Sequence, residues 1–125
     1  MREILIDSSV LIDFLERRAT DEAKGLLASH PNSISMITYY EVCHHFLKIG
    51  RSKELDFVKQ KLSSFRMHPI SYEICEEAAR ISNSNKLSVA DSLILATAKV
   101  HDLSLATRDS DLKGKPGVIF LKSLK

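Results

Sequence analysis

Short apolar runs alternate along the chain with longer amphipathic stretches. The run Ile4-Leu5-Ile6 is typical of a parallel strand that is covered on both faces, because such a strand needs no polar side chains. The stretches between the runs repeat apolar residues at intervals of three or four, which is the spacing of one helix face. This pattern predicts strands over residues 2–7, 34–37, 67–70, 103–107 and 118–121.

Helices are expected between these strands, where side-chain oxygens can accept hydrogen bonds from the free amides of a first turn. Gly50 is expected to end one of them, since glycine readily adopts the backbone conformation that follows a helix. The polar run 82–86 predicts a loop. The expected N-caps are Ser8 or Ser9, Thr20, Thr38, Ser52 and Ser88, and a further helix is expected over residues 72–82.

The alternation of strands and helices predicts an α/β fold, with a mainly parallel sheet and helices on both of its faces. We expect one domain over residues 1–125, because a single core is commonly built from about 100–150 residues. In such folds, ligands bind beyond the carboxyl ends of the strands, where the strand order reverses direction. Asp7 ends the first expected strand and Asp109 follows the fourth, so this rule places both at a candidate site.

Composition and charge exclude several classes of protein. Hydrophobic residues make up 44% of the chain and charged residues 27%, a balance that argues against a disordered or membrane protein. The formal net charge of +2 is too small to indicate nucleic-acid binding by itself. No apolar stretch approaches the ~18 residues that span a bilayer, and the first residues lack the layout of a signal peptide. We therefore expect a cytoplasmic protein without membrane association.

Two further acids, Glu41 and Asp91, each follow a hydroxyl residue by three positions, as in a capping box. On a purely structural interpretation, these acids satisfy free backbone amides and interact favourably with the helix dipole. Capping accounts for each acid singly, but it does not explain why all four lie at strand ends or in first helical turns that a parallel sheet directs toward the same rim. We therefore expect Asp7, Glu41, Asp91 and Asp109 to converge.

A converging cluster of carboxylates needs a cation. Two ionised carboxylates ~4 Å apart repel by about 4 kcal/mol at an effective dielectric constant of 20, whereas a helix cap contributes about 1 kcal/mol. A divalent ion turns this repulsion into attraction, and a ligand set made only of oxygens favours Mg²⁺ or Mn²⁺ over zinc. Such ions acidify a bound water and orient a phosphate, so no nucleophilic side chain is needed. The chain contains no G-x-S-x-G elbow, P-loop or H-E-x-x-H motif that would indicate another mechanism.

Four segments of the chain resemble the acidic motifs of PIN domains, and in particular those of VapC toxins. They are Ile6-Asp7-Ser8-Ser9-Val10-Leu11-Ile12, the position of Glu41, residues 88–98 around Asp91, and residues 106–112 around Asp109. The resemblance implies a three-layer α/β/α PIN fold with strand order 3-2-1-4-5 and Mg²⁺- or Mn²⁺-dependent endoribonuclease activity on RNA. It also implies a homodimer, inhibition by a small antitoxin protein, and catalytic metal ligands at Asp7, Glu41, Asp91 and Asp109.

Neighbouring residues receive supporting roles from the same resemblance. Ser8, Ser9 and Thr107 match hydroxyl positions of the family, which lie behind the metal ligands and orient a carboxylate or a water molecule. Asp111 also lies behind the ligands, or faces the metal ions in place of the fourth acid. Arg108, directly before that acid, is a candidate for contact with an RNA phosphate, and a salt bridge to a nearby acid is the alternative.

Two other functions are consistent with parts of the pattern. A response-regulator receiver domain has a similar length, the same alternation and an acidic end to its first strand. A receiver needs a paired acid after the first strand and a phosphate-accepting aspartate at the end of the third, whereas Asp7 stands alone and Asp56 lies in a helical pattern. The other alternative is a PIN-like module that binds RNA without cutting it.

Overall fold

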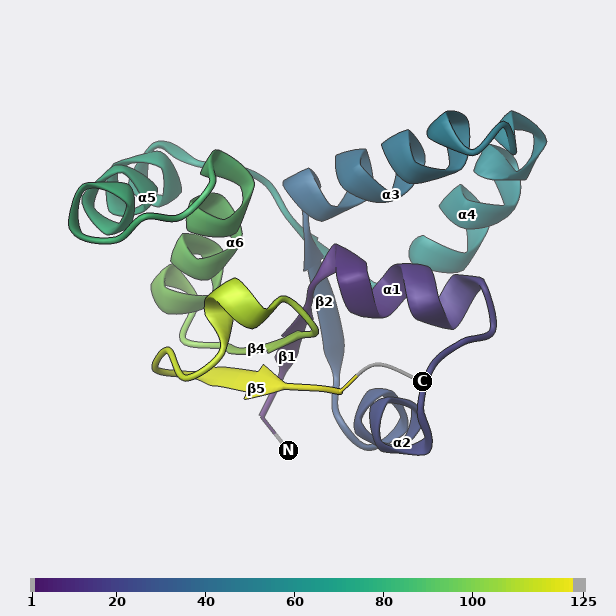
Figure 1. Ribbon diagram of the computed structural model, residues 1–125, viewed down its shortest axis with the longest axis horizontal. Coiled ribbons are helices and arrows are strands. Elements are labelled where there is room, and N and C mark those ends of the chain that lie inside the picture. The colour runs from purple at the N-terminus through teal and green to yellow at the C-terminus, as the bar shows by residue number, and fades with distance from the viewer. Residues whose placement is uncertain (1, 123–125) are drawn as a thin grey trace.

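The computed structural model describes residues 2–122 and contains a five-stranded sheet in the order β3-β2-β1-β4-β5, in which all neighbouring strands are parallel (Figure 1). The strands are β1 Ile4–Ile6, β2 Asn32–Ser35, β3 Arg66–His68, β4 Ser104–Thr107 and β5 Val118–Phe120. The helices are α1 Ser8–Leu15, α2 Asp21–Ser29, α3 Met36–Lys48, α4 Leu55–Leu62, α5 Tyr72–Ser84 and α6 Val89–Val100, with 3-10 turns at Ser52–Glu54 and Ser110–Leu112. The predicted α/β fold and strand order are confirmed.

The side chains of the central strands divide the core into two parts. Ile4 and Ile6 are buried with residues of α1, α2, α3 and α4, whereas Leu5 and Leu105 are buried with residues of α6. In Figure 1, α1 and α2 accordingly lie on one side of the strands and α5 and α6 on the other. Both faces of β1 are covered, which explains its continuous apolar run. None of the helices within residues 2–122 is long and apolar enough to cross a membrane.

The junction between β2 and α3 differs from the prediction. Ser35, and not Thr38, caps α3, because its hydroxyl oxygen accepts a hydrogen bond from the backbone N–H of Ile37 at 3.2 Å. The strand therefore ends at Ser35 and the helix begins at the next residue, without a loop. Thr38 is buried inside the first turn of the helix, so Glu41 lies in the second turn and not in a capping box. Both hydroxyl residues are competent caps, and burial of Thr38 in the core decides between them.

The polar end of α5 also differs from the prediction. The helix continues to Ser84, so the first residues of the expected loop are helical. The hydroxyl oxygens of Ser82 and Ser92 are 2.6 Å apart, which joins this last turn to α6. The Asn85 side-chain amide then donates to the carbonyl oxygen of Ile81 at 3.1 Å and completes the helix end. Polar composition did not end the helix because a neighbouring helix and a local cap satisfy these groups.

The strand order contradicts the receiver-domain alternative. Receiver-like folds have the order 2-1-3-4-5, in which the third strand lies beside the first. In this chain β3 pairs with β2 at one edge of the sheet, and β4 lies beside β1. The third strand ends at His68, and Asp56 lies in α4, away from any strand end.

Candidate metal centre

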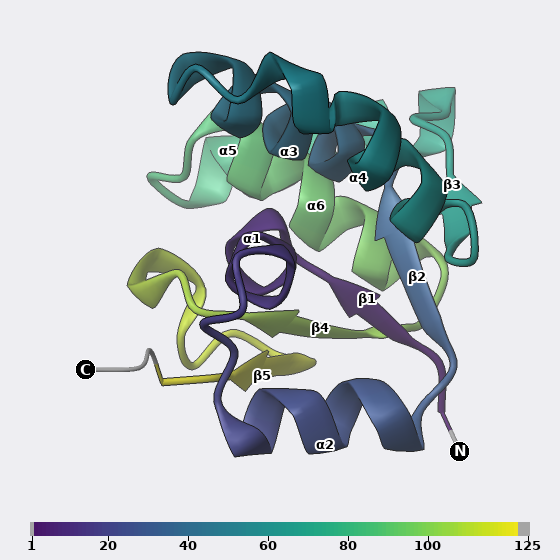
Figure 2. The same ribbon diagram turned by 90° about the vertical axis from the view of Figure 1, so that its right-hand side faces the viewer.

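Asp7 lies where β1 runs directly into α1 (Figure 2), and its carboxylate is held by three hydrogen bonds. Oδ1 accepts the backbone N–H of Ser8 at 2.8 Å, so Asp7 itself caps α1, in place of the predicted Ser8 or Ser9. Oδ2 accepts the hydroxyls of Ser9 at 3.0 Å and Thr107 at 2.6 Å. Burial raises the pKa of Asp7, the three hydrogen bonds oppose this change, and the charge of Asp109 adds to it.

Glu41 reaches the same region from the second turn of α3. Its Oε1 accepts the hydroxyl of Ser8 at 2.9 Å, so consecutive serines of α1 hold two different carboxylates. Partial burial raises the pKa of Glu41, the hydrogen bond from Ser8 opposes this, and the charges of Asp7 and Asp109 raise it further. The carboxylate is therefore fixed at one oxygen and faces other acids.

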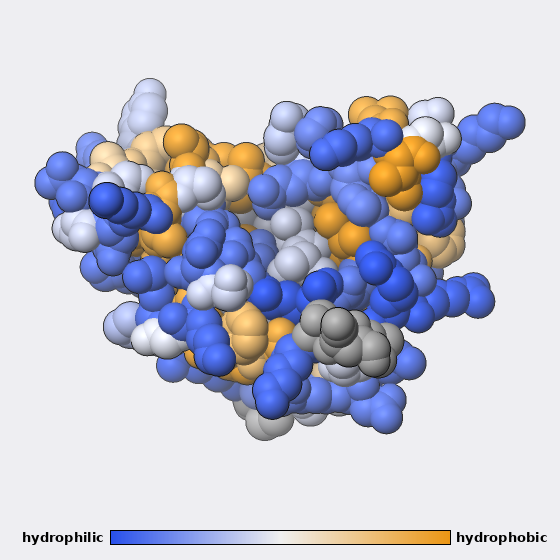
Figure 3. All heavy atoms as spheres, viewed as in Figure 1, coloured by the Kyte–Doolittle hydropathy of each residue, from blue (hydrophilic) through white to orange (hydrophobic). Residues whose placement is uncertain are grey.

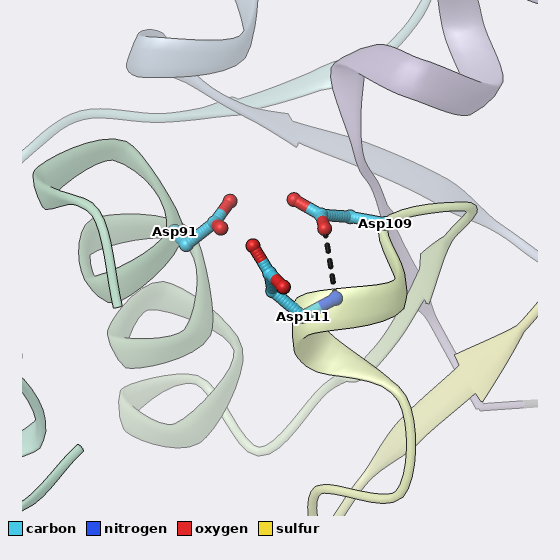
Figure 4. A group of neighbouring side chains, drawn as sticks. All are labelled: Asp91, Asp109 and Asp111. Carbon is cyan, nitrogen blue, oxygen red and sulfur yellow. Dashed lines mark hydrogen bonds between the residues drawn. The ribbon is translucent and has the colours of Figure 1, made fainter. Parts of the chain in front are cut away.

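Asp91 and Asp109 face one another across a short gap, with Asp111 beside them (Figure 4). Asp91 comes from the first turn of α6, and the other two come from the segment that follows β4. Each of the three offers a carboxylate oxygen within 4.8 Å of the oxygens of the other two. The Asp109 carboxylate also accepts the backbone N–H of Asp111 at 2.9 Å, which fixes the short 3-10 turn.

The pKa of Asp91 distinguishes a capping role from a charge cluster. Ser88 caps α6 as predicted, accepting the backbone N–H of Asp91 at 3.1 Å. An acid that served the helix dipole alone would have a lowered pKa, because the dipole favours its charged form. Instead, the pKa of Asp91 is raised to about 7, chiefly by burial and then by the charges of Asp109 and Asp7.

All four predicted acids line one open pocket of about 270 Å³. Its lining consists of Asp7, Ser8, Ser9, Ile12, Glu41, Asp91, Arg108 and Asp109. In Figure 3 the middle of this face, between α6 and α1, is mostly hydrophilic, with some apolar residues beside it. Asp111 is exposed and does not line the pocket, although it lies close to Asp91 and Asp109.

Two oxygens on opposite sides of one Mg²⁺ ion are about 4.2 Å apart, since each bond is about 2.1 Å. The close approach of Asp91, Asp109 and Asp111, whose carboxylate oxygens lie within 4.8 Å of one another, and the oxygen-only donor set of the pocket suit a hard divalent cation.

Comparison with known proteins agrees with this geometry. A sequence model of the PIN domain matches residues 4–117, which include all four acids of the pocket. The chain belongs to the PIN-domain family. Nucleases of this family generally depend on divalent metal ions, and the acidic cluster of this PIN domain suits them.

Relatives of this PIN domain include ribonuclease VapC10 from Mycobacterium tuberculosis strain H37Rv. The two are 36% identical over 115 residues, covering 83% of this chain and 80% of the relative. A solved toxin–antitoxin complex from Klebsiella pneumoniae contains a chain with 34% identity and a TM-score of 0.81, covering 97% of this chain and 99% of that one. FitAcB from Neisseria gonorrhoeae has 25% identity and a TM-score of 0.71, covering 86% and 88%.

The sequence indicated a salt bridge of the pocket residue Arg108 to a nearby acid as one alternative, but it did not identify the acid. Arg108 lines the pocket, and its guanidinium forms an ion pair with Asp13 of α1, which is the alternative expected for this arginine. Asp13 is only 5% exposed and was not singled out from the sequence. The available signal was a lone acid between Ile12 and Phe14 in an otherwise largely apolar helix.

Proposed function

We propose that this protein is an endoribonuclease that depends on Mg²⁺ or Mn²⁺ and acts as the toxin of a type II toxin–antitoxin pair. The observation that carries the proposal is the convergence of four carboxylates, from segments far apart in the chain, on one pocket. The name of the relative VapC10, a ribonuclease, and the toxin–antitoxin complex among the similar structures support it. We expect residues 1–125 to act as one nuclease domain, in the cytoplasm, where RNA is made and used.

In this proposal, Asp7, Glu41, Asp91 and Asp109 hold the metal ions. When bound, the ions acidify a water molecule, orient the scissile phosphate and neutralise charge on the leaving oxygen. Asp111, which has a carboxylate oxygen within 4.8 Å of those of Asp91 and Asp109, would share an ion held between these two residues.

The hydroxyl residues limit how far the proposed ligands can rotate. Thr107 and Ser9 both donate to Oδ2 of Asp7, and Ser8 donates to Oε1 of Glu41. Thr107 also accepts the backbone N–H of Asp109 at 3.0 Å, so one hydroxyl connects two of the proposed ligands. Preorganised ligands of this kind improve metal affinity, because less side-chain freedom is lost when the ion binds.

Arg108 is the proposed contact for RNA. Its side chain is 31% exposed and lines the acidic pocket, so a phosphate of a bound strand is within its expected reach. A guanidinium recognises phosphate through parallel N–H donors.

The decisive experiment is cleavage of a generic single-stranded RNA with Mn²⁺, followed by chelation with EDTA. We expect cleavage by the wild-type protein that stops on chelation, and none by Asp91→Asn. Asp21→Asn is the matched control, because Asp21 is also an acid in the first turn of a helix but is exposed and lies in α2. Binding of RNA without metal-dependent cleavage would replace the proposal with the inactive RNA-binding module. Sequencing the products would then identify the RNA and the cleavage site.

The proposed partners are a second copy of the chain and an antitoxin protein. Light scattering should give a mass of twice 14.1 kDa for the purified protein if it is a homodimer. Co-expression with the product of a neighbouring small gene should yield a stable complex in which cleavage is inhibited. A monomer, or cleavage unaffected by the neighbouring product, would remove that part of the proposal.

A further inference from the structure

A positively charged side chain, that of Arg108, lies in the wall of the acidic pocket. Arg108 lines the pocket together with Asp7, Glu41, Asp91 and Asp109. The nearby carboxylates attract any mobile positive charge, and an arginine can bind two carboxylate oxygens at once. A side chain of this length would therefore compete with a divalent ion if it were free to turn toward the cluster.

Asp13 forms an ion pair with this arginine. Nη1 of Arg108 is paired with Oδ2 of Asp13, and the backbone N–H of Arg108 donates to the Ser9 hydroxyl at 3.1 Å. Ser9 and Asp13 are four residues apart on α1 and so lie on one helix face. One face of α1 thus fixes both the backbone and the side chain of Arg108.

The aspartate in this ion pair is buried, whereas the Arg108 side chain is 31% exposed. The Asp13 side chain is 8% exposed, and its other oxygen lies 3.6 Å from Nη2 of Arg18. Within residues 2–122, Nε of Arg108 is buried without a hydrogen-bond partner, so Asp13 supplies the paired contact that keeps the guanidinium in place. Removing one partner of such a pair costs more free energy than removing one partner of a fully exposed pair, because the remaining charge is partly buried.

We propose that Asp13 is a positioning residue that ties Arg108 to the pocket wall and so keeps the four carboxylates available to the metal ion. This inference rests on the proposed metal-dependent function. Without Asp13, the guanidinium turns toward the acids, neutralises part of their charge and weakens metal binding. A purely structural ion pair between α1 and the end of β4 would stabilise the fold without this effect.

Calorimetric titration with Mn²⁺ separates the two roles when it is carried out on a double-mutant cycle. The proteins are the wild type, Asp13→Asn, Arg108→Gln and the double variant, all titrated at a temperature at which circular dichroism shows each to be folded. We expect Asp13→Asn to bind Mn²⁺ about tenfold more weakly, a change that corresponds to roughly 1.4 kcal/mol. In the Arg108→Gln background, the same substitution should change the affinity by less than about twofold, because no arginine remains to be released.

Asp13→Glu provides the rescue control. It keeps the negative charge that pairs with Arg108, so Mn²⁺ affinity should stay within about twofold of the wild type. An equal loss of affinity from Asp13→Asn in both backgrounds would assign the effect to the lost charge alone and overturn the inference. An unchanged affinity in Asp13→Asn, or a loss in Asp13→Glu as large as in Asp13→Asn, would overturn it too. Failure of the wild-type protein to bind Mn²⁺ would instead remove the proposed function and this inference with it.

Discussion

Two groups of acidic side chains in this protein have opposite surroundings. On the α5–α6 hairpin, Glu77 lies 2.7 Å from Nζ of Lys99 and 3.2 Å from Nη1 of Arg80. The hydrogen bond from Lys99 is the main reason that the pKa of Glu77 is lowered. In the pocket, Asp91 and Asp109 face each other, and the pKa of Asp91 is raised to about 7.

The difference shows that the chain provides a basic partner for some acids and not for others. Elsewhere on the surface it provides a base for an acid, as Lys99 does for Glu77. At the pocket, the base among the lining residues, Arg108, is paired with Asp13 instead. The repulsion in the pocket is therefore relieved by protons or by a cation from solution, and a hard divalent ion suits the oxygens best.

The largest expected difference between the pocket acids and Glu77 is in the rate of RNA cleavage. Asp7→Asn should lower the rate by roughly three orders of magnitude, since a catalytic metal ion contributes several kcal/mol to transition-state stabilisation. Glu77→Gln should leave the rate unchanged, because its carboxylate serves only a surface ion pair. Single-turnover rates with a labelled RNA measure both. Similar losses in the two variants would mean that the two acidic regions do not differ in function.

A smaller loss is expected when a support of the pocket is removed without changing its charge. Thr107→Val keeps the shape of a buried side chain but removes the hydroxyl that donates to Asp7 and accepts from the amide of Asp109. Loss of such supporting contacts typically lowers metal affinity or activity by about 10–100-fold. Mn²⁺ titration and cleavage rates should fall together. Full activity in this variant would show that Asp7 needs no fixed orientation.

Stability in the absence of metal should respond in opposite directions in the two regions. At pH 8, Asp91→Asn should raise the free energy of unfolding by roughly 1–2 kcal/mol, because it removes a repelled charge that solvent only partly screens. Glu77→Gln should leave it unchanged or lower it, because an attractive pair is lost. Urea unfolding with EDTA present measures both values. A clear loss of stability in Asp91→Asn would favour the helix-capping interpretation of this acid.

The pH dependence of this same stability difference is a further test of the role of Asp91. Its pKa is about 7 in the folded chain against an ordinary value of 3.8, so the folded state binds more protons between these values. The free energy of unfolding of the metal-free protein should therefore fall as the pH rises from about 4 to about 7. The difference between wild type and Asp91→Asn should be largest above pH 7 and close to zero near pH 4. A difference that does not change with pH would indicate that Asp91 is not the titrating group.

The sequence predicted those parts of the fold that depend on local patterns. The apolar run Ile4-Leu5-Ile6 indicated a strand covered on both faces, and the strand-end rule led to Asp7 and Asp109, which line the same pocket. These predictions succeeded because periodicity and strand ends depend on residues that are close together in the sequence.

The parts that were missed depend on contacts between distant segments. Ser35 and Thr38 are both suitable caps, and only burial of Thr38 in the core selects the earlier one. The Asp13–Arg108 pair joins residues 95 positions apart, so although the lone acid in α1 was a local signal, nothing near it in the sequence identified Arg108 as its partner.

The central claim is that the pocket formed by Asp7, Glu41, Asp91 and Asp109 binds a divalent cation. A crystal of the active protein soaked in Mn²⁺ tests it most directly through anomalous scattering. We expect an anomalous peak within bonding distance of carboxylate oxygens of this pocket, and loss of that peak in Asp91→Asn crystals. A peak confined to other sites, or none in protein that cleaves RNA, would contradict the account.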